Sequence, residues 1–278
     1  MVESFAEVNG IKISYEIFGD GYPVLLVHGF GDTKEGWRAQ TPELSKKFKV
    51  IRFDNRGAGN SDKPKDSYEL DDFVEDIKGL LDHLNIDKAH IIGWSLGGML
   101  VQNFVLKYPE RANKVVLINT NAGTPDESGP EAYKNMRLGK EKLKKEDPVK
   151  AFWSTARTGF YIKFRKQMEA EPSKKWYGLW SVEDLIEESS RHIATEQEIE
   201  LQGNVLKVHN TKDRLKNITN PILLLTASHD RITPKSSMEE MHGLLPNSTF
   251  YVVDKAGHNS PLEKAPEVNQ EIMNFLKN

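Results

Sequence analysis

The stretch Ile91-Ile92-Gly93-Trp94-Ser95-Leu96-Gly97-Gly98-Met99 decides the fold of this chain. The apolar run 89–92 is typical of a buried strand that leads into it, and the apolar residues after the turn are spaced as in a helix. Between them Ser95 is the centre of a G-x-S-x-G pattern, and Gly93 and Gly97 are the small neighbours that a sharp strand-to-helix turn requires. Such a turn exposes the serine hydroxyl at the carboxyl edge of a sheet, so Ser95 is the candidate nucleophile.

Length and composition limit the classes of protein to consider. A chain of 278 residues can form one large α/β domain or two small ones. Its net charge of −3 and pI near 6.3 argue against nucleic-acid binding, which usually needs a marked basic excess. The first residues form neither a basic nor an apolar leader, and no apolar run approaches the roughly 18 residues of a membrane span. We therefore expect a cytoplasmic protein that acts on a small molecule and neither binds nucleic acid nor inserts into a membrane. The chain has no cysteine, so disulfides are excluded.

Strand-like and helix-like segments alternate in the first 121 residues and again after residue 213. Asn9-Gly10, a strong hairpin signal, separates the strand-like segments 5–8 and 11–18. Short apolar runs typical of strands buried on both faces follow at 23–27, 50–53, 89–92, 114–118, 222–227 and 249–253. Helical patterns lie among them at 37–46, 70–84, after Met99, at 238–244 and from Pro266. The alternation predicts an α/β fold with a mostly parallel sheet.

The alternation stops between residues 124 and 212, where only helical signals remain. Asp147-Pro148 predicts a helix start, and Gly159 predicts a break in the helical pattern that follows. Ser181 and Thr195 each begin a sequence that resembles a capping box. We therefore expect an all-helical insertion in the α/β core.

The charge of this insertion is unevenly distributed. Residues 131–175 contain 13 Lys/Arg and 6 Asp/Glu, whereas residues 183–200 contain one Arg and seven Asp/Glu. The basic part could bind an anionic substrate or a membrane surface. A solvated helix face that pairs with its acidic neighbour is the interpretation that we favour.

A serine hydroxyl at neutral pH needs an imidazole to take its proton, and the imidazole needs a carboxylate to orient it. In sheets with this serine turn, the three groups follow in the order Ser, Asp or Glu, His, each at the carboxyl end of a strand. Asp230 and His258 occupy such positions after the strands 222–227 and 249–253. The competing position for the acid, after the strand 114–118, offers Asn119 and Asn121 instead. The sequence therefore predicts Ser95, His258 and Asp230 as a catalytic triad.

Two backbone N–H groups are candidates for stabilising a developing oxyanion. Leu96 begins the helix after the serine, so its N–H has no partner within that helix. His28-Gly29-Phe30-Gly31 follows the strand 23–27, where this class of site takes its second donor. We expect the N–H groups of Phe30 and Leu96 to form the oxyanion hole.

These motifs resemble the α/β-hydrolase superfamily over essentially the whole chain, and in particular its serine esterase, lactonase and carbon–carbon-bond hydrolase members. In chain order the motifs are His28-Gly29-x-Gly31, Asp54-x-Arg56-Gly57-x-Gly59-x-Ser61-Asp62, Gly93-x-Ser95-x-Gly97-Gly98, Asp230 and Gly257-His258-x4-Glu263-x2-Pro266-x2-Asn269.

The resemblance implies a mostly parallel, eight-stranded sheet flanked by helices and formed by residues 1–121 and 213–278. Residues 122–212 would be a helical cap domain, or lid, over the site. The resemblance also implies structural roles for Asp54 and Arg56, which would tie the loop after their strand near the oxyanion loop.

The serine itself narrows the chemistry. Haloalkane dehalogenases and epoxide hydrolases of this superfamily have Asp at the position of Ser95 and form an alkyl-ester intermediate. Ser95 predicts acyl transfer instead, with attack on an ester carbonyl and hydrolysis of the acyl-enzyme by water. The histidines show no metal-ligand spacing and the chain has no phosphate-binding loop, so we expect no metal and no cofactor.

The leading hypothesis is a carboxylesterase-like serine hydrolase, monomeric or homodimeric, that acts on apolar, small-to-medium acyl esters. Aromatic side chains near the turn and in the cap are candidates for the substrate pocket: Trp37, Trp94, Phe152, Trp153 and Phe160. Two alternatives stay open. The same triad could hydrolyse a carbon–carbon bond or open an enol-lactone, or it could belong to a non-catalytic small-molecule receptor.

Overall fold

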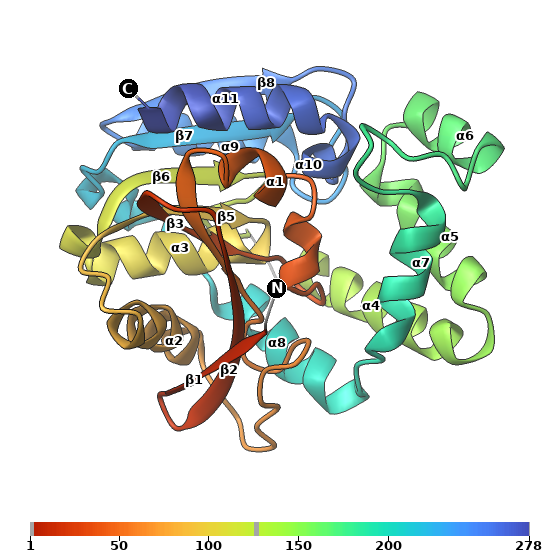
Figure 1. Ribbon diagram of the computed structural model, residues 1–278, viewed down its shortest axis with the longest axis horizontal. Coiled ribbons are helices and arrows are strands. Elements are labelled where there is room, and N and C mark those ends of the chain that lie inside the picture. Colours follow the sequence, from red (N-terminus) through yellow and green to blue (C-terminus); the bar gives the residue numbers. More distant parts are fainter. Residues whose placement is uncertain (1–2, 125–127, 278) are drawn as a thin grey trace.

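Residues 3–124 and 128–277, described by a computed structural model, form an α/β structure built on an eight-stranded sheet (Figure 1). The strand order is β1-β2-β4-β3-β5-β6-β7-β8. β1 and β2 pair antiparallel with each other, β2 pairs antiparallel with β4, and all other neighbours are parallel. The strands are β1 (Ser4–Val8), β2 (Ile11–Phe18), β3 (Tyr22–Val27), β4 (Phe48–Phe53), β5 (Ala89–Trp94), β6 (Ala112–Ile118), β7 (Ile222–Ala227) and β8 (Ser248–Val253). The sheet predicted from the sequence is thus confirmed.

Both faces of the sheet are covered by apolar side chains. In β3, Leu25 and Val27 belong to one buried cluster, whereas Val24 and Leu26 belong to another. This alternation follows from the two-residue period of a strand, and it explains why the parallel strands are apolar at nearly every position. Helices α2, α3 and α9 contribute to the first cluster and helices α1 and α11 to the second.

The predicted core helices are found except near residue 40, and the short helix α10 was not predicted. The core helices are α1 (Thr41–Leu44), α2 (Leu70–His83), α3 (Leu96–Lys107), α9 (Lys235–Leu244), α10 (Ser260–Glu263) and α11 (Ala265–Lys277), with 3-10 turns η1 (Lys34–Trp37), η2 (Pro109–Arg111) and η3 (Lys212–Asn217). The predicted helix 37–46 is wrong in its extent: η1 ends at Trp37 and α1 begins at Thr41. Pro42 explains the interruption, because it has no N–H to continue a helix from the preceding turn. In the described part of the chain, no helix combines the length and apolar character needed to cross a membrane.

Between β6 and β7 the chain forms the helical insertion, α4 (Ser128–Glu146), α5 (Pro148–Gly159), α6 (Ile162–Ala170), α7 (Val182–Arg191) and α8 (Glu196–Val208). The predicted signals are confirmed: the Asp147 side chain caps α5, α5 ends at Gly159, and Ser181 and Thr195 form the capping boxes of α7 and α8. Figure 1 shows α4 to α7 grouped beside the sheet, on the side where α10 lies.

The two ends of the insertion meet at its base. Gly123 pairs with Asn210 in an isolated β-bridge, and the Thr211 N–H donates to the Ala122 carbonyl at 2.8 Å. A third apolar cluster joins insertion and core: Ala39, Phe152, Ala156, Phe160, Met168, Trp176, Trp180, Val182, Leu262 and Ala265. The insertion is therefore packed on the core rather than suspended from it.

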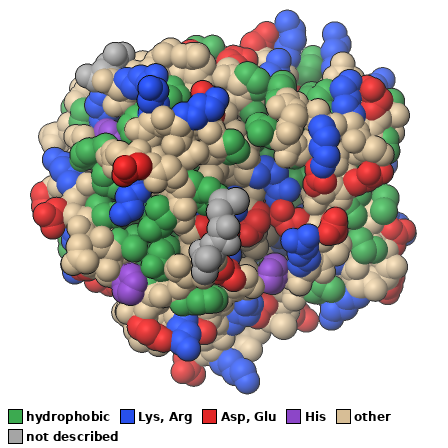
Figure 2. Space-filling view, in the orientation of Figure 1, with side chains coloured by type: hydrophobic (Ala, Val, Ile, Leu, Met, Phe, Trp, Pro, Cys, Tyr) green, Lys and Arg blue, Asp and Glu red, His purple; other side chains and the backbone are tan. Residues whose placement is uncertain are grey.

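Ion pairs neutralise much of the insertion's charge. Lys134 contacts Glu200 at 2.7 Å, and Lys175 contacts Asp184 at 2.5 Å. Figure 2 shows basic and acidic side chains interspersed on the right of the view, where the insertion lies. These contacts agree with the interpretation that the basic part pairs with its acidic neighbour, although Lys134 is buried rather than solvated.

Candidate active site

Ser95 lies at the strained turn that the sequence predicts. Its backbone has φ 57° and ψ −119°, a conformation that costs a non-glycine residue free energy. The turn is held from β6, because the Ser95 N–H donates to the Ile118 carbonyl at 2.9 Å and the Thr120 hydroxyl donates to the Ser95 carbonyl at 2.8 Å. A Cβ on Gly93 would lie 2.5 Å from the Gly97 carbonyl oxygen, so a side chain at 93 would collide with the start of α3.

Asp230 and His258 meet at the carboxyl ends of β7 and β8. His258 Nδ1 donates to Asp230 Oδ2 at 2.8 Å, and both side chains are buried. The same carboxylate accepts hydrogen bonds from the backbone of Ile232 and Thr233 and from the Thr233 hydroxyl, at 2.8 to 2.9 Å. This set of donors fixes the carboxylate, which in turn fixes the orientation of the ring. Thr233 was not predicted as a site residue, although Thr and Asp side chains commonly form local hydrogen bonds in turns.

Ser95 and His258 line one cavity of about 190 Å³ beneath the insertion. The hydrogen bonds among the described residues do not include one between the Ser95 hydroxyl and the His258 ring. Such bonds are often long in ligand-free sites and shorten when substrate binds. The arrangement therefore brings the three predicted residues to one place. The hydrogen bond between His258 and Asp230 is formed, whereas the one between Ser95 and His258 is not.

The backbone of His258 is held by two residues from neighbouring strands. Asn119 Nδ2 donates to the His258 carbonyl at 2.7 Å, and Trp94 Nε1 donates to the same oxygen at 3.2 Å. Asn119 also donates to the Ser260 hydroxyl at 2.9 Å and accepts from the Ala227 N–H at 2.9 Å. The strand end that was the competing position for the acid thus holds an amide that positions the histidine loop.

The loop that contains Phe30 approaches the serine closely. A Cβ on Gly29 would lie 3.3 Å from Ser95 Cβ, so a side chain at this position would crowd the serine. His28 Nε2 accepts from the Asn55 N–H at 2.9 Å, which requires that Nδ1 carries the proton donated to the Gly29 carbonyl at 2.9 Å. His28 is thus buried and occupied in holding this loop beside the serine turn.

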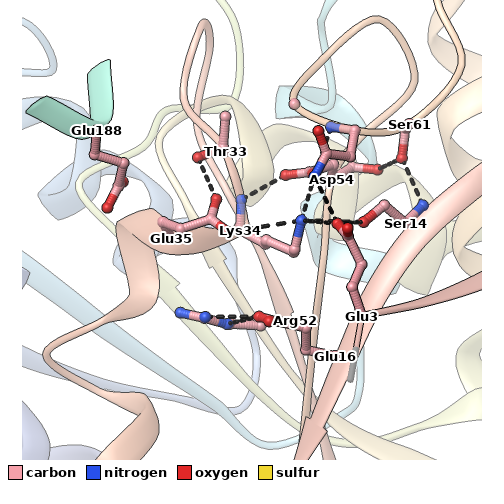
Figure 3. Close-up of polar contacts among 12 residues, drawn as sticks. Glu3, Ser14, Glu16, Thr33, Lys34, Glu35, Arg52, Asp54, Ser61 and Glu188 are labelled. Atoms are coloured by element: carbon pink, nitrogen blue, oxygen red, sulfur yellow. Dashed lines mark hydrogen bonds and ion pairs between the residues drawn. The ribbon is translucent and has the colours of Figure 1, made fainter. Parts of the chain in front are cut away.

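Asp54 and Lys34 form the support of this loop (Figure 3). Asp54 Oδ1 accepts from the Lys34 N–H at 2.7 Å, and Asp54 Oδ2 accepts from Lys34 Nζ at 2.8 Å. Lys34 Nζ also contacts Glu3 at 2.9 Å and Ser14 at 3.0 Å, so the network reaches the first hairpin. Although burial lowers the pKa of Lys34, the negative charge of Asp54 and the hydrogen bonds to Asp54 and Glu3 raise it above its usual value.

Arg56, two residues after Asp54, also anchors the loop after β4. Its guanidinium donates two hydrogen bonds to Asp76 of α2, both at 2.7 Å. Asp54 therefore ties the loop after β4 to Lys34, close to the candidate oxyanion loop, whereas Arg56 ties it to α2.

Three of the five predicted pocket residues line the cavity, namely Trp94, Phe152 and Phe160. Trp37 and Trp153 are not among the lining residues. Trp37 is fully buried under Trp94, with its ring at 6.1 Å and edge-on, and Trp153 packs edge-on against Phe152. Aromatic residues fill the core as readily as a pocket, so the sequence could not separate the two groups.

Charged residues of the insertion also line the cavity, and their place there was not predicted from the sequence. They are Arg137, Lys140, Lys144 and Glu188, joined from the core by Asp32 and Arg38. Arg137 donates to the carbonyl of Gly31, the residue after Phe30, and Gln202 of α8 accepts from the Gly31 N–H at 3.4 Å. The insertion thus contacts the candidate oxyanion loop directly. In the described parts of the chain, no group of three or more His, Asp or Glu side chains is placed to hold a metal ion.

Comparisons with known proteins agree with this architecture. The model of the alpha/beta hydrolase fold family matches residues 22–265. A putative carbamate hydrolase of Caulobacter segnis is 26% identical over 279 residues, which cover 95% of this chain and 96% of that protein. A shorter match, 33% identical over 122 residues, to an uncharacterized protein of Mycobacterium tuberculosis covers 44% of this chain and only 36% of that protein.

Solved structures give the same result. A thermophilic esterase from Thermogutta terrifontis superposes with a TM-score of 0.81 at 26% identity, covering 100% of this chain and 98% of that one. An enol-lactonase from Burkholderia xenovorans LB400 shares the fold with a TM-score of 0.80 at 23% identity, covering 99% and 100%. The chain belongs to the alpha/beta hydrolase family.

Proposed function

We propose that this protein is a serine hydrolase that cleaves carboxylic esters through an acyl-enzyme. The observation that carries the proposal is the buried His258–Asp230 pair, which opens onto the same cavity as the strained Ser95 turn. A carboxylate on Nδ1 leaves Nε2 free to accept the serine proton, as a general base requires.

In the proposed cycle, Ser95 Oγ attacks the ester carbonyl while His258 Nε2 takes its proton. The N–H groups of Phe30 and Leu96 bind the oxyanion, a contribution of roughly 10²–10³ in rate for each donor. His258 then protonates the leaving alcohol, and the water that enters is activated by the same ring to release the acid. Asp230 stays ionised and stabilises the imidazolium.

We propose that residues 122–212 act as a cap domain over this site, with the core formed by residues 1–121 and 213–278. The β-bridge between Gly123 and Asn210 supports these boundaries, because it joins the two ends of the insertion. Phe152 and Phe160 of the cap supply apolar area for an acyl group. A cavity of about 190 Å³ is smaller than the roughly 300–1,000 Å³ of drug-sized sites, which favours short acyl chains.

The test is steady-state hydrolysis of p-nitrophenyl esters from acetate to palmitate, with wild type and Ser95→Ala in parallel. Turnover that peaks at short chains and disappears in Ser95→Ala would support the proposal. Feeble turnover with every ester would contradict it. Carbamate, enol-lactone and carbon–carbon substrates, which the same attack could cleave, would then be tried, followed by ligand binding without turnover.

A further inference from the structure

One face of α4 forms a basic wall of the active-site cavity. Arg137, Lys140 and Lys144 are spaced three and four residues apart, which places them on the same side of the helix. All three line the cavity that Ser95 and His258 also line.

Lys144 has its partners within the protein. Its ammonium contacts Glu141 at 2.8 Å and donates to the His192 carbonyl at 3.1 Å. Across the cavity, Arg38 of the core is ion-paired with Glu188 of α7. These side chains are therefore satisfied without a ligand.

Lys140 and Arg137 are not fully satisfied. Among residues 3–124 and 128–277, no hydrogen bond or ion pair to the half-buried Lys140 ammonium is found. Arg137 is nine-tenths buried and donates to the Gly31 carbonyl, yet its Nε has no partner in the described structure. The acid of the facing loop, Asp32, accepts the Thr33 N–H at 2.9 Å and forms no ion pair with Lys140 in this part of the chain.

An unpartnered ammonium in a confined cavity is energetically costly. Burial, together with the nearby charges of Arg137 and Lys144, lowers the pKa of Lys140 to about 7, although the charges of Glu141 and Asp32 oppose the shift. A bound anion would offset this unfavourable free energy, because a guanidinium and an ammonium carry the opposite charge to a carboxylate and supply the donors that its oxygens accept.

We propose that Lys140 and Arg137 form an anion subsite that selects esters whose acyl chain ends in a carboxylate. This inference rests on the proposed ester hydrolysis, and it adds the class of substrate. Arg137 contacts the residue next to Phe30, so a carboxylate held there lies within a short chain of the scissile carbonyl. The purely apolar ester of the sequence hypothesis would leave Lys140 unpaired and the Nε of Arg137 without a partner in the described structure, although Arg137 also contacts Glu141 at 3.5 Å.

The experiment compares two matched esters, mono-4-nitrophenyl glutarate and 4-nitrophenyl pentanoate, together with the succinate and adipate homologues. The readout is the ratio of kcat/KM for the anionic ester to that for the neutral one. We expect a ratio above about ten in wild type, a fall of at least tenfold in Lys140→Met, and recovery of most of the ratio in Lys140→Arg. Lys142→Met, at an exposed position of the same helix, is the control and should leave the ratio unchanged.

A wild-type ratio near or below one at every chain length, or an unchanged ratio in Lys140→Met, would overturn the subsite. If neither ester is hydrolysed, the proposed esterase function fails and the subsite is judged by binding alone. Calorimetric titration of glutarate into wild type and Lys140→Met then decides: binding that is lost in the variant supports the subsite, and no binding to wild type refutes it. Thermal unfolding of each variant shows whether it is folded.

Discussion

Glu263 of α10 accepts a hydrogen bond from the backbone N–H of Tyr161 in the insertion, at 3.1 Å. The same oxygen, Oε2, accepts from the Gly257 N–H at 2.9 Å, directly before His258. The other oxygen, Oε1, is buried without a partner in the described structure. One carboxylate thus joins the insertion to the histidine loop, and burial raises its pKa to about 7.

This raised pKa predicts a loss of stability as the pH rises. Between the usual carboxyl pKa of 4.5 and the folded value of about 7, the folded state keeps a proton that the unfolded state has released. The free energy of unfolding therefore falls across this window and stays low above it. Glu263→Gln keeps an acceptor oxygen without the charge, so its stability should lose this dependence, a difference of roughly 1–3 kcal/mol between pH 5 and pH 8. Urea unfolding across this range measures it, with Glu271→Gln as the control, and a wild-type slope in Glu263→Gln would refute the assignment.

The low pKa of Glu3 makes the opposite prediction at acid pH. Burial raises the pKa of Glu3, but hydrogen bonds from Lys34, Ser14 and Asn60 outweigh it and hold the pKa at about 2. A lowered pKa gives stability that is present above pH 4.5 and is lost as the pH falls toward 2. Because Glu3 is partly exposed, we expect Glu3→Gln to cost only about 1–2 kcal/mol at pH 7 and to flatten this acid limb. The exposed Glu7→Gln should change neither quantity, and equal effects of the two substitutions would contradict a specific role of Glu3.

Asn119 should affect turnover through the position of His258. Asn119→Gly removes the amide that holds the His258 carbonyl and tolerates the positive φ of 44° at this position. We expect kcat to fall about 10- to 100-fold with little change in KM, since the substrate does not contact the amide. Asn220→Gly removes a comparable side chain, bonded to Pro109 and Ala112, and serves as the control. If kcat of Asn119→Gly equals that of wild type, the loop is positioned by other contacts.

Phe160 should limit the length of the acyl chain. It lines the cavity and is buried, so Phe160→Ala enlarges the space near the reacting carbonyl. The optimum in a p-nitrophenyl ester series should move by at least two carbons toward longer chains. Trp153→Phe, outside the cavity wall, should keep the wild-type optimum. An optimum that moves in the Trp153 variant but not in the Phe160 variant would show that the substrate lies elsewhere.

The sequence predicts the core of the candidate site because local rules determine it. The glycines around Ser95 mark a turn that few other residues permit, and Asp230 and His258 follow strands whose apolar runs identify them. Thr233 and Asn119 could not be found in the same way. Asn119 matters through a hydrogen bond to His258, 139 positions away in the sequence, which only the folded sheet brings close. Thr233 bonds to Asp230 within one turn, but nothing in the local sequence marks that turn as part of the site.

The residues of the insertion that line the cavity were less predictable from the sequence than Ser95, Asp230 and His258. The basic composition of residues 131–175 is visible in the sequence, but the face of α4 that turns inward depends on how the insertion packs. Lys134 is paired with Glu200, whereas Lys140, six residues later, lines the cavity. Trp37 was a pocket candidate by type alone, and the turn η1 buries it in the core instead.

The most direct test of the account is covalent labelling with diethyl 4-nitrophenyl phosphate, which traps an activated serine as a stable phosphoryl ester. We expect wild type to release one equivalent of 4-nitrophenol and to carry one adduct, located by peptide mass spectrometry on Ser95. His258→Ala should react far more slowly than wild type. Ser95→Ala should carry no adduct on the peptide that contains position 95. Labelling of Ser95→Ala at the wild-type rate, or an adduct on another residue, would contradict a nucleophilic Ser95.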